Sequence, residues 1–190
     1  IRISGGCVRD LKANQVSGHI QSVTGHYMQG VEVQLSPDSL FRNYLVDYTD
    51  STGYYQFNNL AAGQSYCIRG FKNDDVLQGV NLLDALDIQK YLLGKSRFNG
   101  YDQYIAADIN HSDRISVMDL VSLQQVMLGK LRHFPNNLSW RFISLQDAVD
   151  PIELSEFQDY TRFTIDSFEN LQLDMIGVKI GDVNRDVQID

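Results

Sequence analysis

The chain has 190 residues, of which 43% are hydrophobic and 21% are charged, and its formal net charge is −8. This composition is that of a globular protein with a substantial core, and it excludes an intrinsically disordered chain. The acidic balance argues against nucleic acid or an anionic membrane as the main partner, because phosphate binding needs clustered Lys and Arg. No apolar run approaches the ~20 residues that a membrane-spanning helix needs, so no membrane span is expected.

The N-terminal segment, residues 1–15, carries apolar Ile1, Ile3 and Val8 but precedes any regular pattern of strands and turns. It lacks the charged-then-apolar form of a signal peptide, so the numbered chain is either mature or trimmed. A strand with an apolar face and no obvious partner can add to the sheet edge of a neighbouring subunit, although pairing within its own domain is the default. The sequence leaves both pairings open.

Residues 16–70 have the texture of short strands separated by turns. The stretch GVEVQL (30–35) alternates apolar and polar side chains as a half-buried strand does. Turns at 51–53 and 62–63 delimit further strands, and several short strands at this spacing predict a small antiparallel β-sandwich. The motifs VSGHI, GVEVQL and TDSTGYYQFNNLAAGQSY, in this order, resemble the prealbumin-like family of carboxypeptidase regulatory-like domains and collagen-adhesin B-type repeats. The resemblance implies stalks, spacers and adhesin modules rather than catalysis.

A repeat with an offset of 35 residues occupies the middle of the chain. GVNLLDALDIQKYLLGK (79–95) matches RISVMDLVSLQQVMLGK (114–130), and apolar residues at helical spacing predict a helix in each copy. Gly94 and Gly129 follow where a left-handed C-terminal cap would lie. Two amphipathic helices of this size must bury their apolar stripes, so we expect them to pack on each other or on a sheet.

The twelve residues DINHSDRISVMD (108–119) before the second helix predict a metal site. Ca²⁺ takes six to eight oxygen ligands, and a loop that runs into a helix supplies them from positions 1, 3, 5, 7, 9 and 12. The apolar residue expected at position 8 is Ile115. The alternative is a polar turn that happens to precede a helix. The predicted ligands are Asp108, Asn110, Ser112, the backbone carbonyl of Arg114, Ser116 and Asp119.

The first copy follows the same template less well. Leu77 stands at position 5 and cannot ligate through its side chain, so this site is expected to be weaker. A third fragment, GDVNRDVQID, repeats the oxygen spacing at Asp182, Asn184 and Asp186 without a following helix, and it either lends ligands to a neighbouring site or is an exposed polar end. The predicted ligands of the first copy are Asn73, Asp75, the Gly79 carbonyl, Asn81 and Asp84.

The position-12 aspartates, the helices and the duplication together resemble the dockerin family of secreted bacterial proteins, in which each repeat is a calcium loop followed by one helix. Two residues depart from that pattern: Ser112 replaces the usual Asp at position 5, and Asp113 replaces the usual Gly at position 6. Asp tolerates the left-handed conformation better than most residues, so both changes predict reduced affinity rather than loss.

The order of a prealbumin-like sandwich, a dockerin-like pair and the later motifs FPNNLSWRF and IGVKIGDVN resembles a recurrent region of large secreted proteins of the Bacteroidetes kind. That resemblance implies secretion to the extracellular space or cell surface. Cys7 and Cys67 have no zinc or redox spacing, and they either form one disulfide or are two small buried hydrophobic residues. Secretion favours the disulfide.

The expected fold is mainly β with a small α part: a prealbumin-like antiparallel β-sandwich, a dockerin-like pair of calcium loop–helix repeats, and C-terminal strands such as SWRFISL and LQLDMIGVKIG. The expected divisions are an N-terminal strand segment, the sandwich, the calcium-binding pair, and a C-terminal strand region packed on the preceding units. They span residues 1–15, 16–70, 71–133 and 134–190, respectively.

The sequence contains no nucleophile elbow, phosphate-binding glycine loop or HExxH motif, so an enzyme is not expected. The leading functional hypothesis is a non-catalytic, calcium-stabilised building block of an extracellular filament or adhesin, which self-associates by β-strand addition. Two other classes stay open. One is a docking module whose helix pair binds a cohesin-like partner, and the other is a glycan-binding accessory domain of a secreted enzyme.

Overall fold

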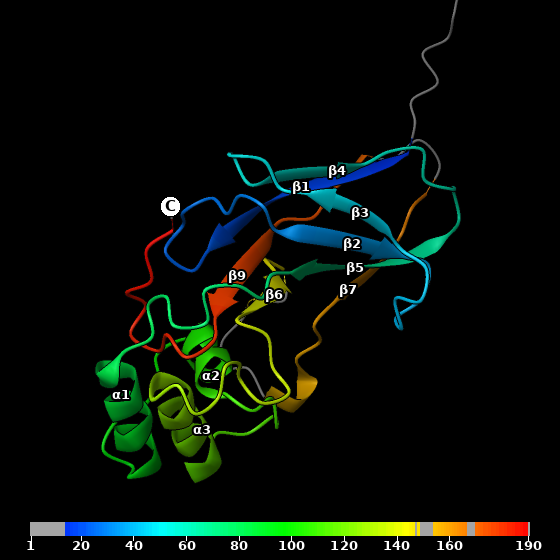
Figure 1. The fold of residues 1–190 in the computed structure, drawn as a ribbon. Coiled ribbons are helices and arrows are strands. Elements are labelled where there is room, and N and C mark those ends of the chain that lie inside the picture. Colours follow the sequence, from blue (N-terminus) through cyan, green and yellow to red (C-terminus); the bar gives the residue numbers. More distant parts are fainter. Residues whose placement is uncertain (1–13, 147, 149–153, 167–169, 190) are drawn as a thin grey trace, which may run out of the picture.

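The computed structural model describes residues 14–146, 148, 154–166 and 170–189. In this part of the chain the protein is mainly β, with two sheets and three α-helices, and the helices gather beyond one end of the sheets (Figure 1). The expected combination of a β-sandwich with a smaller helical part is confirmed at this level. The described N-terminal strands come first in the chain, the helices follow, and further strands return to the sheets after the helices.

The first sheet is built around β1 (Gln15–Ser22), whose side chains alternate between half-buried and buried along its whole length. This alternation is the strand pattern expected when one face of a sheet covers a core. β1 pairs antiparallel with β4 but parallel with β8 and β9, so the N-terminal and C-terminal parts of the chain share this sheet. The other strands of the sheet are β4 (Tyr54–Phe57), β9 (Met175–Lys179), β6 (Trp140–Ser144) and β8 (Asn170–Gln172).

The second sheet is antiparallel throughout and has the order β3-β2-β5-β7. β2 contains the alternating GVEVQL residues, and Val33 and Leu35 point into the core, as the sequence indicates. β3 is a short edge strand, and its apolar side chains are largely exposed. The four strands are β3 (Leu45–Tyr48), β2 (Glu32–Ser36), β5 (Ser65–Phe71) and β7 (Thr161–Thr164).

The C-terminal strands complete both sheets instead of packing beside a finished sandwich, which the division into residues 16–70 and 134–190 had suggested. β9 lies between β1 and β6 in the first sheet, and β7 extends the second sheet along β5. The N-terminal strands β1 and β5 therefore gain three of their neighbours, β7, β8 and β9, only from the C-terminal part of the chain. Local alternation of apolar residues specifies strands but not their neighbours, so the sequence pattern missed this pairing.

Two hydrophobic clusters lie on opposite faces of the first sheet. One joins the two sheets and contains Trp140 and Phe142 of β6; the other joins β6 and β9 to the helices and contains Ile143 and Val178. Alternate residues of β6 thus face different cores, and the whole strand is buried. Trp140 anchors the first of these clusters, because it is 1% exposed.

The repeated segments form α1 (Leu82–Leu92) and α3 (Val117–Met127), which pack on each other, as the duplication predicts. Gly94 and Gly129 follow the two helices with φ of 66° and 68°, so both left-handed caps are confirmed. A third helix, α2 (Tyr101–Ala107), was not predicted; its seven residues are too few to show a helical period. α2 packs against β9 of the first sheet.

The proposed disulfide cannot be examined in the described residues. Cys67 is buried in β5, where it also fits the alternative of a small hydrophobic residue. Cys7 lies outside the described residues, together with the rest of segment 1–13. The pairing of Cys7 with Cys67 stays a prediction.

Candidate metal centre

The loop before α3 is closed by two buried aspartates, Asp108 and Asp119, both 0% exposed. The Asp108 carboxylate accepts hydrogen bonds from the backbone N–H groups of Ser112 (2.9 Å) and Asp113 (3.0 Å). The Asp119 carboxylate accepts from the N–H groups of Asn110 (3.2 Å) and Ser116 (2.8 Å). Burial, together with the negative charge of Asp119 nearby, raises the pKa of Asp108 above its usual range. The two carboxylates at the ends of the predicted loop therefore lie near each other.

Three further features of this loop bear on the calcium-loop template. Asp113 at position 6 has a φ of 59°, so Asp does occupy the left-handed conformation that Gly usually supplies. The Oδ1 atom of Asn110 is buried and has no hydrogen-bond partner among the described residues. A buried acceptor without a partner is costly, and a cation beside it would satisfy it. The Ser112 hydroxyl donates to the carbonyl of Arg114 (3.2 Å), so these two predicted ligands are neighbours.

Asp119 also has a structural role that needs no metal ion. Ser116 is the N-cap of α3, and its Oγ accepts from the N–H of Met118 while the Asp119 carboxylate accepts from the N–H of Ser116. This reciprocal arrangement is a capping box. It is repeated at α1, where Asn81 is the N-cap and Asp84 accepts from its N–H at 2.8 Å. The cap explains the residues at positions 9 and 12, but it does not explain Asp108 or the orphan oxygen of Asn110.

The first predicted loop is assembled differently from the prediction. The Asn73 Oδ1 accepts from the N–H of Ser139 at the start of β6 (3.0 Å), so this side chain serves the sheet. Asp75 is exposed and has a φ of 44°, and Gly79 has a φ of 72°. Of the predicted ligands of this loop, Asn81 and Asp84 lie together at the start of α1. Further hydrogen-bond donors to Asp84 come from the C-terminal part of the chain.

The C-terminal segment 182–187, rather than the residues directly before α1, forms the loop that meets Asp84. The buried Asp84 carboxylate accepts from the N–H groups of Val183 (2.8 Å) and Asn184 (3.0 Å). The carboxylate of Asp182 accepts from the N–H groups of Asp186 (3.0 Å) and Val187 (3.0 Å). These are the bonds that Asp119 and Asp108 make in the continuous loop. Residues 182, 184, 186 and 84 thus correspond to positions 1, 3, 5 and 12, which residues 108, 110, 112 and 119 occupy there.

Two further features support this correspondence. Residues at position 4, Arg185 and His111, both have a left-handed backbone, with φ of 65° and 54°. The segments that lead into the two loops lie side by side, because the N–H of Gly181 donates to the carbonyl of Ala106 (2.9 Å). The fragment GDVNRDVQID is therefore no exposed polar end. The shared Asp-x-Asn spacing at 108–110 and 182–184 was the signal in the sequence, and only the fold could show that α1 follows it in space.

The discontinuous loop concentrates negative charge. Burial, with a smaller effect from Asp182, raises the pKa of Asp84 to about 6. Burial also raises the pKa of Asp182, and Asp186 adds to that rise. The Asp186 Oδ2 accepts from the side-chain amides of Asn81 (2.8 Å) and Asn184 (3.0 Å). Within the described residues, no three His, Cys, Asp or Glu side chains are grouped tightly enough to hold a metal ion by themselves. A calcium site here would need amide or backbone oxygens as well, which is the usual donor set of such loops.

No protein-family model and no curated protein matches the chain. Among solved structures, the shaft pilin SpaA from Lactobacillus rhamnosus GG is 9% identical with a TM-score of 0.32, and the match covers 88% of this chain and 48% of that chain. The major pilin subunit BcpA of Bacillus cereus is 19% identical with a TM-score of 0.27, over 32% of this chain and 19% of that chain. A 9R-lipoxygenase from Cyanothece is 13% identical with a TM-score of 0.26, over 38% and 13%.

The chain spans less than half the length of these proteins. Likeness at these TM-scores establishes neither a common fold nor a common function. The described helices include none with the length and apolar character that crossing a bilayer requires.

Proposed function

We propose that the chain is a non-catalytic, secreted structural module that calcium stabilises, and that it is a building block of an extracellular filament or surface adhesin. One observation carries this proposal. The loop that closes on α1 joins residues 99 and 100 positions apart, through the bonds of Asp84 to Val183 and Asn184. An ion in such a loop strengthens the connection between chain segments that also complete the sheets, which suits mechanical duty.

The two loops supply different sets of oxygens to calcium. The continuous loop offers the carboxylates of Asp108 and Asp119 with the side chains of Asn110, Ser112 and Ser116 and the Arg114 carbonyl. The discontinuous loop offers the buried carboxylates of Asp84 and Asp182, the exposed carboxylate of Asp186 and the side chain of Asn184; the three carboxylates are not grouped tightly enough to hold an ion by themselves. Because affinity rises with the number of charged ligands, we expect the site at α1 to bind calcium more tightly. With Asn73, Asp75 and the Gly79 carbonyl as its ligands, the site at α1 is expected to be the weaker of the two, so the structure-based expectation is the opposite.

A thermal melt with and without a chelator tests the calcium proposal. We expect EDTA to lower the melting temperature of the wild-type chain, because an ion bound only by the folded state stabilises it. Asp108→Ala, Asp119→Ala and Asp182→Ala should each reduce the response to calcium. Asp87→Ala is the matched control, because Asp87 lies on α1 but pairs with Lys90 (2.8 Å) away from the loops. Identical melting curves of the wild type in calcium and in EDTA would reject the proposal.

Filament assembly by strand addition is supported by one sheet edge and one segment. Val46 and Tyr48 on the edge strand β3 are 42% and 60% exposed. The N–H of Thr49, just after β3, donates to the carbonyl of Val31 (3.0 Å). Because successive N–H groups of a strand point in opposite directions, the N–H of Val46 points away from β2. Residues 1–13, whose sequence includes Ile1, Ile3 and Val8, supply the added strand in this proposal.

Side chains take outward N–H groups on both neighbouring edge strands. On β3 the N–H of Tyr48 donates to Asp47 (2.9 Å), so the proposed donor to an added strand is the N–H of Val46. The outward N–H groups of β4 are taken by side chains: Gln56 donates to Asp47 (2.8 Å) and Tyr54 donates to Asp50 (3.0 Å). Charge also favours the pairing. Residues 1–13 contain Arg2, Arg9 and Lys12 against one acidic residue, Asp10, whereas the whole chain has a net charge of −8.

Size-exclusion chromatography and negative-stain imaging test the assembly. We expect the full chain to polymerise and the chain 14–190 to remain monomeric. Val46→Pro removes an outward N–H without breaking the β2–β3 ladder and should also prevent assembly, whereas Val46→Thr, which keeps that N–H, should not. Polymers of the chain 14–190 would exclude strand addition by this segment. Polymers of Val46→Pro alone would move the acceptor to another edge.

A docking module is the second candidate function, favoured by an apolar surface on the helices. Leu82 and Leu83 at the start of α1 are 73% and 58% exposed, and Val117 and Met118 at the start of α3 are 63% and 59% exposed. These four residues correspond pairwise in the repeat, and their exposure leaves them accessible to a partner. Pull-down with a cohesin-like partner, with Leu82→Ser and Val117→Ser as the negative variants, tests this function. A glycan array tests the accessory-domain alternative.

A further inference from the structure

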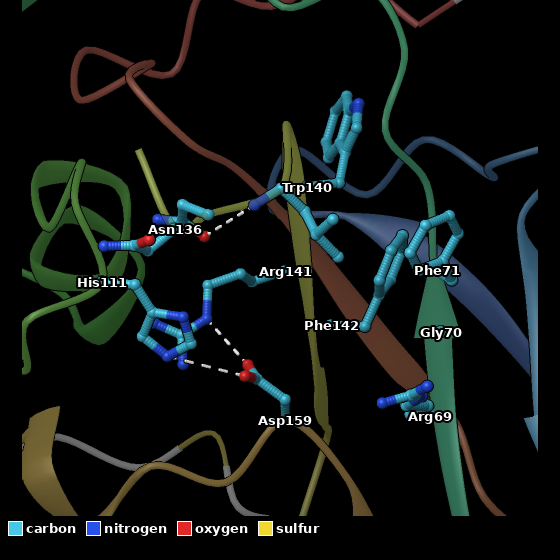
Figure 2. A pocket seen from close by; sticks show the side chains of 11 residues that line it. Arg69, Gly70, Phe71, His111, Asn136, Trp140, Arg141, Phe142 and Asp159 are labelled. Carbon is cyan, nitrogen blue, oxygen red and sulfur yellow. Dashed lines mark hydrogen bonds and ion pairs between the residues drawn. The ribbon is translucent and has the colours of Figure 1, made fainter. Parts of the chain in front are cut away.

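A cavity of about 300 Å³ lies where the sandwich, the loop before α3 and the segment after the 3₁₀ turn Leu154–Glu156 meet. It opens beside β6, the edge strand of the first sheet. None of the proposed calcium ligands lines it, although His111 of the loop before α3 does. Figure 2 shows Arg141 and His111 on one side of it and the rings of Phe71 and Phe142 on the other. Its walls are formed by Arg69, Gly70, Phe71, His111, Asn136, Asn137, Leu138, Trp140, Arg141, Phe142 and Asp159.

The feature that points to a ligand is the guanidinium of Arg141, whose side chain is 3% exposed. Its Nε donates to Asp159 (2.8 Å), and its plane lies over the ring of Phe157, 4.3 Å from the centroid. Its Nη2 is buried and has no hydrogen-bond partner among the described residues. The Nε1 of Trp140 is buried without a partner as well, but Figure 2 shows the indole pointing away from Arg141 and Asp159. Arg and Trp nitrogens can only donate, so the missing partners must be acceptors.

The charge around the cavity specifies which acceptor fits best. Asp159 is the single carboxylate of the lining, and it pairs with Arg141 and is approached by His111 at 3.6 Å. Arg69 lines the cavity as well, although its Nε donates to Gln34 (2.8 Å) and its guanidinium lies 4.0 Å from the centroid of the Phe41 ring. The lining is therefore positive in a chain whose net charge is −8. The planar fork of a guanidinium matches a carboxylate, and the aromatic rings opposite it favour an organic body attached to that carboxylate.

We propose that this cavity binds a small organic carboxylate, which Arg141 holds through its free Nη2 while the apolar body packs against Phe71 and Phe142. The carboxylate has two possible sources, a free small molecule or an acidic side chain presented by another protein chain. Both use the same chemistry, and both are compatible with the proposed structural function without depending on it.

Two-dimensional NMR of the full chain in calcium, titrated to millimolar probe, tests the proposal. Benzoate is the free-carboxylate probe, N-acetylglutamate amide represents a protein-borne carboxylate, and benzamide is the uncharged control. We expect benzoate or N-acetylglutamate amide to shift the amides of residues 69–71 and 136–142, at least tenfold more tightly than benzamide. Whichever of the two carboxylates binds more tightly identifies the source. Absent shifts at these residues, equal binding of benzamide, or tighter binding of inorganic phosphate would overturn the proposal.

A matched pair of variants separates binding from folding. Arg141→Met removes the proposed contact but also an ion pair of the core, so it needs a gentler companion. Asn136 lines the cavity with a φ of 55°, which Asp tolerates, and Asn136→Asp adds a repelling charge there. Asn59→Asp is the control, because Asn59 has a φ of 60°, is exposed and does not line the cavity. We expect Asn136→Asp to weaken carboxylate binding at least tenfold and Asn59→Asp to leave it unchanged; unchanged binding in Asn136→Asp would refute the site.

Discussion

The two loop–helix units share hydrogen bonds around their aspartates but differ in chain connectivity. They also differ at position 6, where Asp113 is left-handed and Val187 is not. Before α3, one continuous stretch of twelve residues supplies every group, from Asp108 to Asp119. Before α1, the loop comes from residues 182–187 and the helix from residues 82–92, with the same bonds around Asp182 and Asp84. The comparison teaches that this loop geometry is specified by backbone N–H groups converging on two aspartates. The hydrogen bonds around the aspartates therefore form even when the loop and the helix come from distant parts of the chain.

The connectivity changes what each unit does for the rest of the molecule. The continuous unit can fold from local contacts, whereas the discontinuous unit requires the C-terminus to find α1 after most of the chain has been placed. Contacts of such sequence separation carry a large loop-closure entropy and form late. The discontinuous unit directly follows β9, which pairs with β1 on one side and with β6 on the other.

Removal of residues 182–190 abolishes the discontinuous unit and leaves the continuous one intact, and it should have the largest effect on stability. It leaves the buried Asp84 carboxylate without its C-terminal partners, and it removes Val183 and Val187, which are 0% and 5% exposed. An uncompensated buried charge costs about 3–5 kcal/mol and each lost valine about 2 kcal/mol. We expect the loss to exceed about 5 kcal/mol, enough to abolish cooperative unfolding in urea followed by circular dichroism. Adding Asp84→Asn to the truncated chain should restore part of the loss; an unchanged urea midpoint after truncation would contradict the linkage.

Asp84→Ala and Asp119→Ala compare the two units residue by residue. Each removes a buried carboxylate that accepts backbone hydrogen bonds, and we expect each to destabilise the calcium-free chain by about 2–4 kcal/mol. Hydrogen exchange should separate them. Asp84→Ala should increase exchange at residues 183–187 and along β9, far away in sequence, whereas Asp119→Ala should affect only residues 108–119. Equal, local patterns in both variants would mean that the C-terminal segment is held by other contacts.

The two units also differ in the residue three positions before the loop, and this difference makes the stability of the chain depend on pH. Ile105 precedes the continuous loop, whereas buried Lys179 precedes the discontinuous one, with its Nζ donating to the carbonyl of Val76 (2.9 Å). Burial lowers the pKa of Lys179 from 10.5 to about 8, although Asp182 and Asp74 act against that shift. Between these values the unfolded chain binds more protons than the folded chain, so stability rises as pH increases from 8 towards 10.5.

We expect a gain of about 2 kcal/mol between pH 7 and 9.5 from this residue. Lys179→Met should abolish that gain, measured as the free energy of unfolding in urea at the two pH values. The comparison stays below pH 10 because burial raises the pKa of Tyr55, whose titration would lower stability at higher pH. The same rise in the wild type and in Lys179→Met would exclude Lys179 as its origin.

Features that depend on local periodicity could be predicted from the sequence, and features that depend on long-range pairing could not. The strand at Val33 and Leu35, the two repeated helices and the left-handed turns at Gly94 and Gly129 follow from spacing alone. The half-loop at Asp182 was visible as a motif, but its place beside Asp84 was not, because nothing in a linear pattern states which distant helix a loop precedes. The cavity around Arg141 combines residues from several elements, and no spacing marks it.

The N-caps give the smallest and most discriminating comparison. Ser116 and Asn81 both cap a helix with a side-chain oxygen, but the Nδ2 of Asn81 also donates to Asp186, which ties α1 to the C-terminal loop (2.8 Å). Alanine at either position should cost about 1 kcal/mol through loss of the cap. Asn81→Ser retains a capping oxygen and removes only the link to Asp186, so it should cost about 0.5 kcal/mol, and that cost should vanish in an Asp186→Ala background. Ser116→Asn, which introduces the amide where no such partner loop exists, should be neutral within the error of urea denaturation. Equal costs for Asn81→Ser and Asn81→Ala would show that the amide, and not the cap, dominates at α1.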